Sequence, residues 1–533
     1  MYDDEAQIVG NQLIEHWKYV PYYFNMQVWA HINPNAVGNY YRPIFMLWMR
    51  INHALFEFHP LGWHLTTVLF HLLATFMVFR LARRLSSRED IAFIAALVFG
   101  LHPAHIEAVA WVSGVTESLF AVLLLGAFLG FLNWREGKNN ARAWSLLLFA
   151  LAIFSKETSV LMLPLIFAYC WLNPREDRPT IAARFWTSLV PTFPYVAVTM
   201  AYLGLRYVAL NGLSHPLHEL SLRVNLLTIP SVLWFYLKML VVPVGLSAFY
   251  DTPYVTSPDL HHFWIPLLAV IVAATGLFFW WWKTRDRLVA FASVLLVLPL
   301  LPLLNFTFFF DGEIAHDRYL YVPSIGFALL VAIAITRLKS SRTLWMVTAA
   351  VAAVFLCLTI WQSLYWADNL VLYSRGVNIA PNNNLALNNL ANETQRRGML
   401  RQATALYARI LDRNPSFYWA NYNLAYALFQ EEKYSEAAHF FRRAASLDAS
   451  DAGTFYYLGQ CEMHLGRLDF AEAAFRRAIA TDSRLLGPRY MLGLVLKQQG
   501  RTREALDYFR AELTKNPNDA NARKEADAIA STM

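Results

Sequence analysis

Charged residues are scarce in this chain of 533 residues: they make up 16% of it, whereas hydrophobic residues make up 57%. That balance excludes an ordinary soluble protein and is typical of a membrane protein. The three cysteines, Cys170, Cys357 and Cys461, are widely separated, which excludes a disulfide framework and a cysteine-based metal site. The opening residues are polar and acidic, which does not fit the basic and apolar pattern of a secretory signal peptide.

Ten apolar runs occupy most of the first 366 residues and are predicted to cross a membrane. Five of the links between them hold three or four basic residues each, whereas the segments 101–114, 155–157, 210–225, 247–262 and 311–318 hold only Lys156, Arg223 and Arg318. By the positive-inside rule the basic links are cytoplasmic, so the net charge of +7 reflects topology and not nucleic-acid binding. The runs are residues 61–79, 91–101, 115–133, 144–154, 158–172, 186–209, 263–282, 288–310, 319–336 and 344–366.

An even number of crossings places both ends of the chain on the non-cytoplasmic side. The apolar run 226–246 must then enter and leave on that side, and residues 43–56 fit a helix that lies in the membrane interface. The acidic N-terminus and the segment after Asp368 therefore share one compartment. We expect the bacterial periplasm, which the compact links favour, or the lumen of the endoplasmic reticulum in a eukaryote.

Charges at membrane depth are costly, so those of the non-cytoplasmic links are candidate site residues. Lys156 and Glu157 separate two runs that are short for a full crossing, which is typical of broken helices around a cavity. Lys156 either binds a phosphate or forms a neutralising contact with Glu157. Arg318 either binds a phosphate or pairs with Asp317. Arg206 lies inside an apolar run and needs an anionic partner or a position near the membrane surface.

Three adjacent acids, Asp3, Asp4 and Glu5, are predicted to lie on the same side. One of them can take a proton from a hydroxyl, or together they can bind a divalent cation; alternatively they form a solvated terminus. A single arrangement unites the charges: an outward cavity with acids at one end and the three basic residues above as phosphate ligands. Such a cavity suits a lipid-phosphate substrate whose tail lies between helices.

A further cluster on this side is His102-Pro103-Ala104-His105-Ile106-Glu107. The spacing of His102, His105 and Glu107 could suit a metal ion. However, Pro103 breaks a helix, and no second group of ligands completes the set. A structural role is therefore favoured, and no metal site is predicted.

After Asp368 the sequence repeats with a period of 34 residues. Each block carries the tetratricopeptide signature, in which a Leu and a small residue open one helix and an Ala opens the next, followed by an aromatic residue. The small residues let paired helices approach, so each block predicts a helix pair. The concave face of such a solenoid usually holds an extended peptide, and Asn388, Asn389, Asn421 and Asn423 could supply amides there. The blocks are residues 384–417, 418–451, 452–485 and 486–519.

Several motifs stand in order along the chain: Tyr2-Asp3-Asp4-Glu5, Tyr41-Arg42-Pro43, His102-Pro103-Ala104-His105-Ile106-Glu107-Ala108-Val109, Ser155-Lys156-Glu157, Pro243-Val244-Gly245-Leu246-Ser247 and Arg318-Tyr319-Leu320-Tyr321-Val322-Pro323-Ser324. Together with the repeats, this order resembles the transmembrane-and-tetratricopeptide-repeat O-mannosyltransferases over nearly the whole chain. That family belongs to the C-type (GT-C) glycosyltransferase superfamily, whose members use polyprenyl-phosphate sugars as donors.

The resemblance implies an enzyme that transfers mannose from a polyprenyl (dolichyl-type) phosphate to serine or threonine hydroxyls of exported proteins, with inversion. The catalytic acid maps onto Asp3, with Asp4 beside it. Lys156 and Arg318, helped by Arg206, would stabilise the departing lipid phosphate. No cofactor beyond the lipid-linked donor is expected, and a divalent cation at the acids stays open. Further cavity candidates are Glu5, Arg42, His102, His105, Glu107, Glu157, Asp317 and Tyr319.

The predicted fold is all-α: a polytopic transmembrane helical bundle followed by a tetratricopeptide-repeat α-solenoid that binds an acceptor or partner protein. In the family a transmembrane helix precedes the acidic pair, so we expect one upstream of Asp3. Two alternatives stay open: a transferase of the same superfamily with a glycan or lipid acceptor, and a non-catalytic membrane-anchored repeat scaffold. The predicted domains are an outer first loop with an interfacial helix (1–60), the transmembrane glycosyltransferase domain (61–366), a linker (367–383), four repeats (384–519) and a C-terminal tail or cap (520–533).

Overall fold

The structure is a computed structural model that describes residues 4–32, 38–175, 180–310 and 312–531. The chain divides into two compact units, Met1–Arg375 and Gly376–Met533. Most of the described residues are helical and none of them lies in a β-strand; isolated bridges join Thr252 to Gly312 and Glu313. The all-α class predicted from the sequence, a membrane helix bundle followed by helical repeats, is confirmed.

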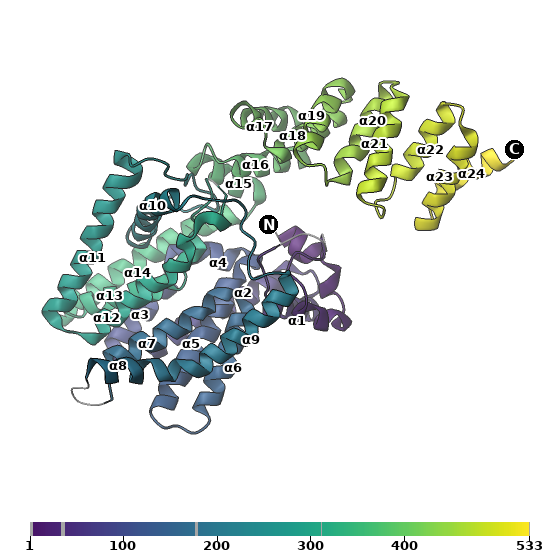
Figure 1. Cartoon of the computed structure of the whole chain (residues 1–533). Coiled ribbons are helices and arrows are strands. Elements are labelled where there is room, and N and C mark those ends of the chain that lie inside the picture. Colours follow the sequence, from purple (N-terminus) through teal and green to yellow (C-terminus); the bar gives the residue numbers. More distant parts are fainter. Residues whose placement is uncertain (1–3, 33–37, 176–179, 311, 532–533) are drawn as a thin grey trace. The chain divides into compact units, whose positions relative to one another are not determined.

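The first unit is a bundle of helices joined by short links (Figure 1). Proline begins several of them, because the first-turn N–H that proline lacks has no partner within a helix. Helices α5 and α6 pack as a hairpin, and α2 lies against α3 and α5. The bounds are α1 (Pro43–Phe56), α2 (Pro60–Ser86), α3 (Glu89–Gly100), α4 (Ile106–Ala110), α5 (Thr116–Arg135), α6 (Ala141–Ser155), α7 (Met162–Leu172), α8 (Ile181–Leu189), α9 (Phe193–Leu210), α10 (Leu222–Val241), α11 (Ile265–Thr284), α12 (Arg287–Val297), α13 (Pro323–Ile335), α14 (Ser341–Ser363) and α15 (Asn369–Ile379).

Among the described residues, seven helices are long and apolar enough to cross a membrane, or eight if the bent pair Glu89–Gly100 and Pro103–Ala110 counts as one span. Six of the seven match crossings predicted from the sequence, and the seventh is α10, for which no crossing is predicted. The other four of the ten predicted crossings fall on the bent pair and on three shorter apolar helices. These are Ala141–Ser155, Glu157–Leu172 and Pro323–Ile335. The chain is a multi-pass membrane protein whose helices include short, interrupted segments.

Helix α10 is long enough to cross a membrane, yet its two ends contact the same end of the bundle. Near its start, the Asn225 side chain donates to the Leu304 carbonyl at 2.9 Å and accepts from the Phe306 N–H at 3.0 Å. Near its end, the Leu240 carbonyl lies 3.0 Å from the ring Nε2 of His102. The links that hold these partners are joined by the bond from the Arg318 N–H to the Glu107 carboxylate (2.8 Å). Helix α10 therefore begins and ends at one end of the bundle.

The second unit contains successive helix pairs that stack side by side (Figure 1). Small residues allow the close packing: a Cβ added at Gly459 would lie 2.6 Å from the Phe475 ring, and one at Gly493 would lie 2.6 Å from the Phe509 ring. The predicted tetratricopeptide repeats are confirmed. The bounds are α16 (Asn384–Arg396), α17 (Leu400–Arg413), α18 (Tyr418–Gln430), α19 (Tyr434–Leu447), α20 (Ala452–His464), α21 (Leu468–Thr481), α22 (Pro488–Gln498), α23 (Thr502–Lys515) and α24 (Ala520–Ala530).

Two of the four repeat asparagines proposed as peptide ligands are buried. Asn421 is fully buried and donates to the carbonyls of Pro415 and Phe417, both at 3.0 Å, so it stabilises the start of its own helix. Asn388 is also buried and accepts a hydrogen bond from Asn423 at 3.0 Å. The prediction that Asn421 contacts a peptide is therefore wrong, because its amide is used within the fold.

Candidate active site

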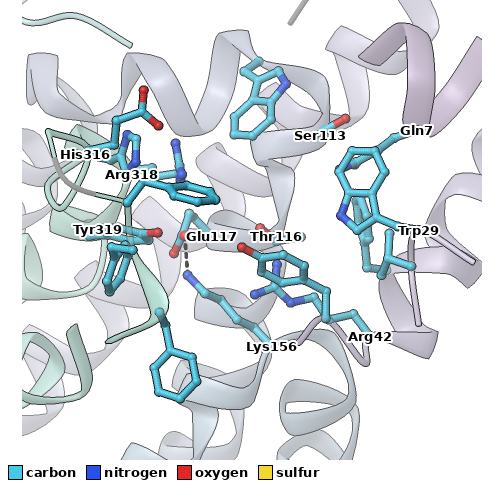
Figure 2. A pocket seen from close by; sticks show the side chains of 18 of the residues that line it. Gln7, Trp29, Arg42, Ser113, Thr116, Glu117, Lys156, His316, Arg318 and Tyr319 are labelled. Atoms are coloured by element: carbon cyan, nitrogen blue, oxygen red, sulfur yellow. Dashed lines mark hydrogen bonds and ion pairs between the residues drawn. The ribbon is translucent and has the colours of Figure 1, made fainter. Parts of the chain in front are cut away.

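A cavity of about 240 Å³ lies at the end of the bundle where α4, α5 and the link before α13 meet (Figure 2). It is lined by aromatic side chains together with three cations and two carboxylates. The polar lining residues are Gln7, Arg42, Ser113, Thr116, Glu117, Lys156, Glu313, His316 and Arg318. The apolar wall is formed by Val28, Trp29, Tyr40, Phe45, Trp111, Leu217, Phe308, Phe309, Phe310 and Tyr319.

Lys156 forms a buried ion pair with Glu117 at the floor of this cavity (Figure 2). Their side chains are only 6% and 4% exposed. The predicted contact between Lys156 and Glu157 is wrong, because the backbone at Lys156 is extended (φ −157°, ψ 130°). An extended backbone sends neighbouring side chains to opposite sides, so the two residues reach different partners.

Glu157 pairs instead with Arg42, which precedes α1. The guanidinium donates two hydrogen bonds to the carboxylate, from Nη2 to Oε1 at 2.6 Å and from Nε to Oε2 at 3.1 Å. Burial disfavours a charged guanidinium, but Glu157 outweighs this effect and raises the pKa of Arg42. The Arg42 guanidinium also lies 4.8 Å from the centre of the Tyr40 ring. Two-point contact fixes both the position and the plane of this cation.

Arg318 reaches the cavity from the other side and pairs with Glu107, not with Asp317. Both its backbone N–H (2.8 Å) and its guanidinium donate to the Glu107 carboxylate. Asp317 accepts from the Tyr250 hydroxyl at 2.6 Å, and burial raises the pKa of Asp317 well above its usual value. The Arg318 guanidinium lies 5.0 Å from the Tyr319 ring centre. The predicted pairing with Asp317 is therefore wrong, because Asp317 faces the 247–250 turn.

Asp4 is attached to the cavity by Ser113. Its Oδ1 accepts from the Ser113 N–H at 2.9 Å and from the Ser113 hydroxyl at 2.7 Å, just before α5 begins. Because Ser113 lines the cavity, these bonds hold the Asp4 carboxylate at its rim. Asp3 lies outside the described residues, and Glu5 is exposed.

Three other candidates lie away from the cavity lining. The Arg206 guanidinium, predicted to bind phosphate, donates to the carbonyls of Leu213 (2.9 Å) and Asn39 (2.8 Å). These N–H groups therefore contact the backbone of the protein. His102 contacts the α10 carbonyl described above, and His105 lies 2.8 Å from the Ser324 hydroxyl. Within the described ranges, no cluster of three or more His, Cys, Asp or Glu residues could hold a metal ion.

The sequence reasoning missed Glu117 and Ser113. Glu117 is an acid inside the apolar run 115–133, and an ionisable residue at such a place is itself a signal of a functional site. Ser113 carries no comparable signal, because a serine next to a helix start most often serves as a cap. Its role depends on the approach of a segment more than a hundred residues earlier in the chain.

Two family models match the chain. The model described as dolichyl-phosphate-mannose-protein mannosyltransferase matches residues 41–202. The model described as anaphase-promoting complex, cyclosome, subunit 3 matches residues 396–478, within the repeats. The first match contains five of the six residues that form the three ion pairs: Arg42, Glu107, Glu117, Lys156 and Glu157.

Curated relatives match across both units. Protein O-mannosyl-transferase F38B6.6 of Caenorhabditis elegans is 26% identical over 427 residues, covering 78% of this chain and 60% of the relative. Protein O-mannosyl-transferase TMTC3 of Mus musculus is 23% identical over 513 residues, covering 89% and 52% respectively. Protein O-mannosyl-transferase TMTC1 of Homo sapiens is 24% identical over 432 residues, covering 72% and 49%.

Among solved structures, the crystal structure of YrrB, described as a TPR protein with an unusual peptide-binding site, is 24% identical. It covers 30% of this chain and 82% of that protein, with a TM-score of 0.29. The chain spans between 49% and 60% of the length of the three curated relatives above. The ordered motifs, the two family models and the curated relatives together support the resemblance of this chain to the transmembrane-and-tetratricopeptide-repeat O-mannosyltransferase family.

Proposed function

We propose that this membrane protein transfers mannose from a polyprenyl-phosphate donor to serine or threonine hydroxyls of exported proteins. The observation that carries the proposal is the cavity in which Lys156, Arg42 and Arg318 lie together, each held by a carboxylate. The names of the curated relatives and of the matching family model agree with this chemistry.

The paired cations suit a reaction in which negative charge develops on a phosphate. A polyprenyl-phosphate sugar is a phosphodiester with one negative charge, and the departing lipid phosphate gains a second. The carboxylates offset the cations before reaction, so the site favours the additional charge of the transition state more than the bound donor. An ammonium has three N–H donors, so Lys156 can contact Glu117 and a phosphate oxygen together.

Asp3 is proposed as the general base that takes the proton from the acceptor hydroxyl, with Asp4 orienting the acceptor or the sugar. Support comes from the two hydrogen bonds by which Ser113 holds Asp4 at the cavity rim. Attack from the rim on a donor whose phosphate lies at the cavity floor proceeds on the side opposite to the leaving group, which gives inversion. The cavity and the repeats are proposed to lie on the non-cytoplasmic side, since the basic links lie at the other ends of the helices.

The repeats are proposed to bind the acceptor polypeptide and thereby raise its effective concentration for transfer. Deleting residues 384–519 should raise the KM for protein acceptors far more than the KM for short peptides. An equal rise for both acceptors would contradict this role.

The proposal is tested with membranes that carry the chain, with and without an upstream transmembrane helix, given radiolabelled polyprenyl-phosphate mannose and a protein extract. Label should move to protein and should be lost in Asp3→Ala. Label that moves to glycan or lipid instead would favour another acceptor. Full transfer in Asp3→Ala would overturn the proposed base, and no transfer by the folded protein would favour a non-catalytic scaffold.

A further inference from the structure

A second cavity, of about 710 Å³, lies at the opposite end of α5 from the candidate active site. The active-site cavity contacts the first turn of α5, whereas this one contacts Phe131, Trp134 and Arg135 in its last turns. Because α5 has 20 residues, its two ends are about 30 Å apart. Figure 1 shows α8, which also lines the cavity, at the lower end of the bundle in the view.

Three arginines define one side of this cavity: Arg135, Arg142 and Arg175. Arg135 donates to the Cys170 thiol (2.8 Å) and to the Asn173 carbonyl, and Arg175 donates to the Arg135 carbonyl at 2.7 Å. The Arg142 guanidinium lies 5.0 Å from the Trp134 ring centre. Their partners are thus carbonyls, a thiol and rings. None of the described residues that line the cavity is an acid; residues 176–179 lie outside the described residues.

A neighbouring cavity on the other side of α5 shows the contrasting arrangement. Two of its three arginines are paired with acids: Arg83 lies 2.8 Å from Glu89, and Arg84 contacts Glu136. Internal neutralisation of this kind leaves little attraction for an external anion. Among the described residues, the arginines of the larger cavity are held in place without a carboxylate, so they attract an anion.

The rest of the lining of the larger cavity is apolar apart from Thr187. Its wall includes Trp186 and Phe193, which are 57% and 50% exposed on the surface of the bundle. Exposed aromatic side chains at the ends of membrane helices lie at the level of lipid head groups. The cavity therefore presents its cations to a lipid head group and its aromatic wall to the part of a lipid tail next to that head group.

We infer that this cavity binds an anionic membrane lipid whose head group is a phosphomonoester, with the phosphate on the arginines and a tail along the Trp186–Phe193 wall. A phosphomonoester carries between one and two negative charges at neutral pH and matches a site with three cations. Basic pockets between membrane helices are suited to phosphate head groups. The site is separate from the proposed transfer reaction.

The experiment uses the full-length chain in nanodiscs of phosphatidylcholine that contain a small fraction of radiolabelled phosphatidic acid. The amount of phosphatidic acid retained by the purified protein is measured as the fraction of phosphatidic acid in the nanodiscs is lowered. Arg142→Gln/Arg175→Gln should weaken retention roughly tenfold or more, because two charge-assisted contacts are lost. Both side chains are exposed, whereas Arg135 anchors the end of α7 and is left unchanged.

The matched control is Arg287→Gln/Arg342→Gln, which removes two exposed cations from the starts of α12 and α14. Retention should be unchanged in this control and reduced by Trp186→Ala. Equal loss in the two double variants, or no loss in either, would overturn the inference. Full displacement of the lipid by inorganic phosphate would also overturn it, because the site would then bind a soluble anion.

Discussion

The buried pair of Lys156 and Glu117 allows structural and catalytic roles to be separated in a single cycle of variants. The side chains are 6% and 4% exposed, so neither charge is solvated when its partner is removed. Loss of one partner from such a pair costs about 3–5 kcal/mol. Lys156→Met and Glu117→Gln should each lower the free energy of unfolding by about that amount.

The double variant Lys156→Met/Glu117→Gln removes both charges while keeping similar side-chain volumes. Its unfolding free energy should return to within about 1 kcal/mol of the original protein, which gives a coupling energy of several kcal/mol. Transfer of mannose should nevertheless stay lost, because the ammonium proposed to contact the donor phosphate is absent. The stability of the pair and the chemistry of the lysine thus respond differently to the same change.

The unfolding free energy is measured by titration with denaturing detergent in mixed micelles, and transfer is measured with labelled polyprenyl-phosphate mannose. Arg287→Gln is a suitable control, since this exposed cation lies at the start of α12. Recovery of both stability and transfer in the double variant would refute the catalytic role of Lys156. Single variants as stable as the original protein would refute the buried ion pair.

Three further predictions concern other parts of the molecule. Gly326→Ala should destabilise the bundle by about 1–3 kcal/mol or more in the same titration, because a Cβ there would collide with backbone atoms of α12; an unchanged midpoint would contradict that packing. In the repeats, partial burial opposes ionisation of Glu472, but hydrogen bonds from Arg476 and Arg501 lower its pKa. The contribution of ionised Glu472 to stability is complete above about pH 4.5 and is lost as the pH falls through the lowered pKa. Hydrogen exchange in α21, corrected for intrinsic rates, should therefore depend on pH, and Glu472→Gln should reduce that dependence. Ser113→Ala should lower kcat about tenfold and leave the KM for the donor unchanged, since one of two bonds to a carboxylate is removed; a change in KM alone would place Ser113 in donor binding.

The fold could be predicted from the sequence because its signals are local. Apolar runs and a 34-residue period are visible within short windows, and they are sufficient to indicate membrane helices followed by helix pairs. The number of crossings is less certain from the sequence, because broken helices such as those around Lys156 are too short to match a membrane thickness. Helix α10 shows the same limit, since length alone does not distinguish a span from a helix with both ends at one side.

The candidate site could be predicted only in part. Lys156 and Arg318 are indicated by their position in the non-cytoplasmic links and Arg42 by a motif, and the structure brings all three to one cavity. Their partners could not be identified, because the paired residues are 39, 115 and 211 positions apart in the chain. Nearest-neighbour reasoning offers Glu157 and Asp317 as alternative partners instead. Contacts over such separations depend on how helices pack, and no local pattern records that packing.

The central claim is that the cavity cations hold the phosphate of a lipid-linked sugar. The most direct measurement is cross-linking of the full-length chain in membranes with a photoreactive polyprenyl-phosphate mannose, followed by identification of the labelled peptides. Labelling should fall on the segments around Glu117, Lys156 and Arg318, should be competed by unlabelled donor, and should be weaker in Arg318→Gln than in Arg287→Gln. Labelling of other segments, or equal labelling in the two variants, would contradict the claim.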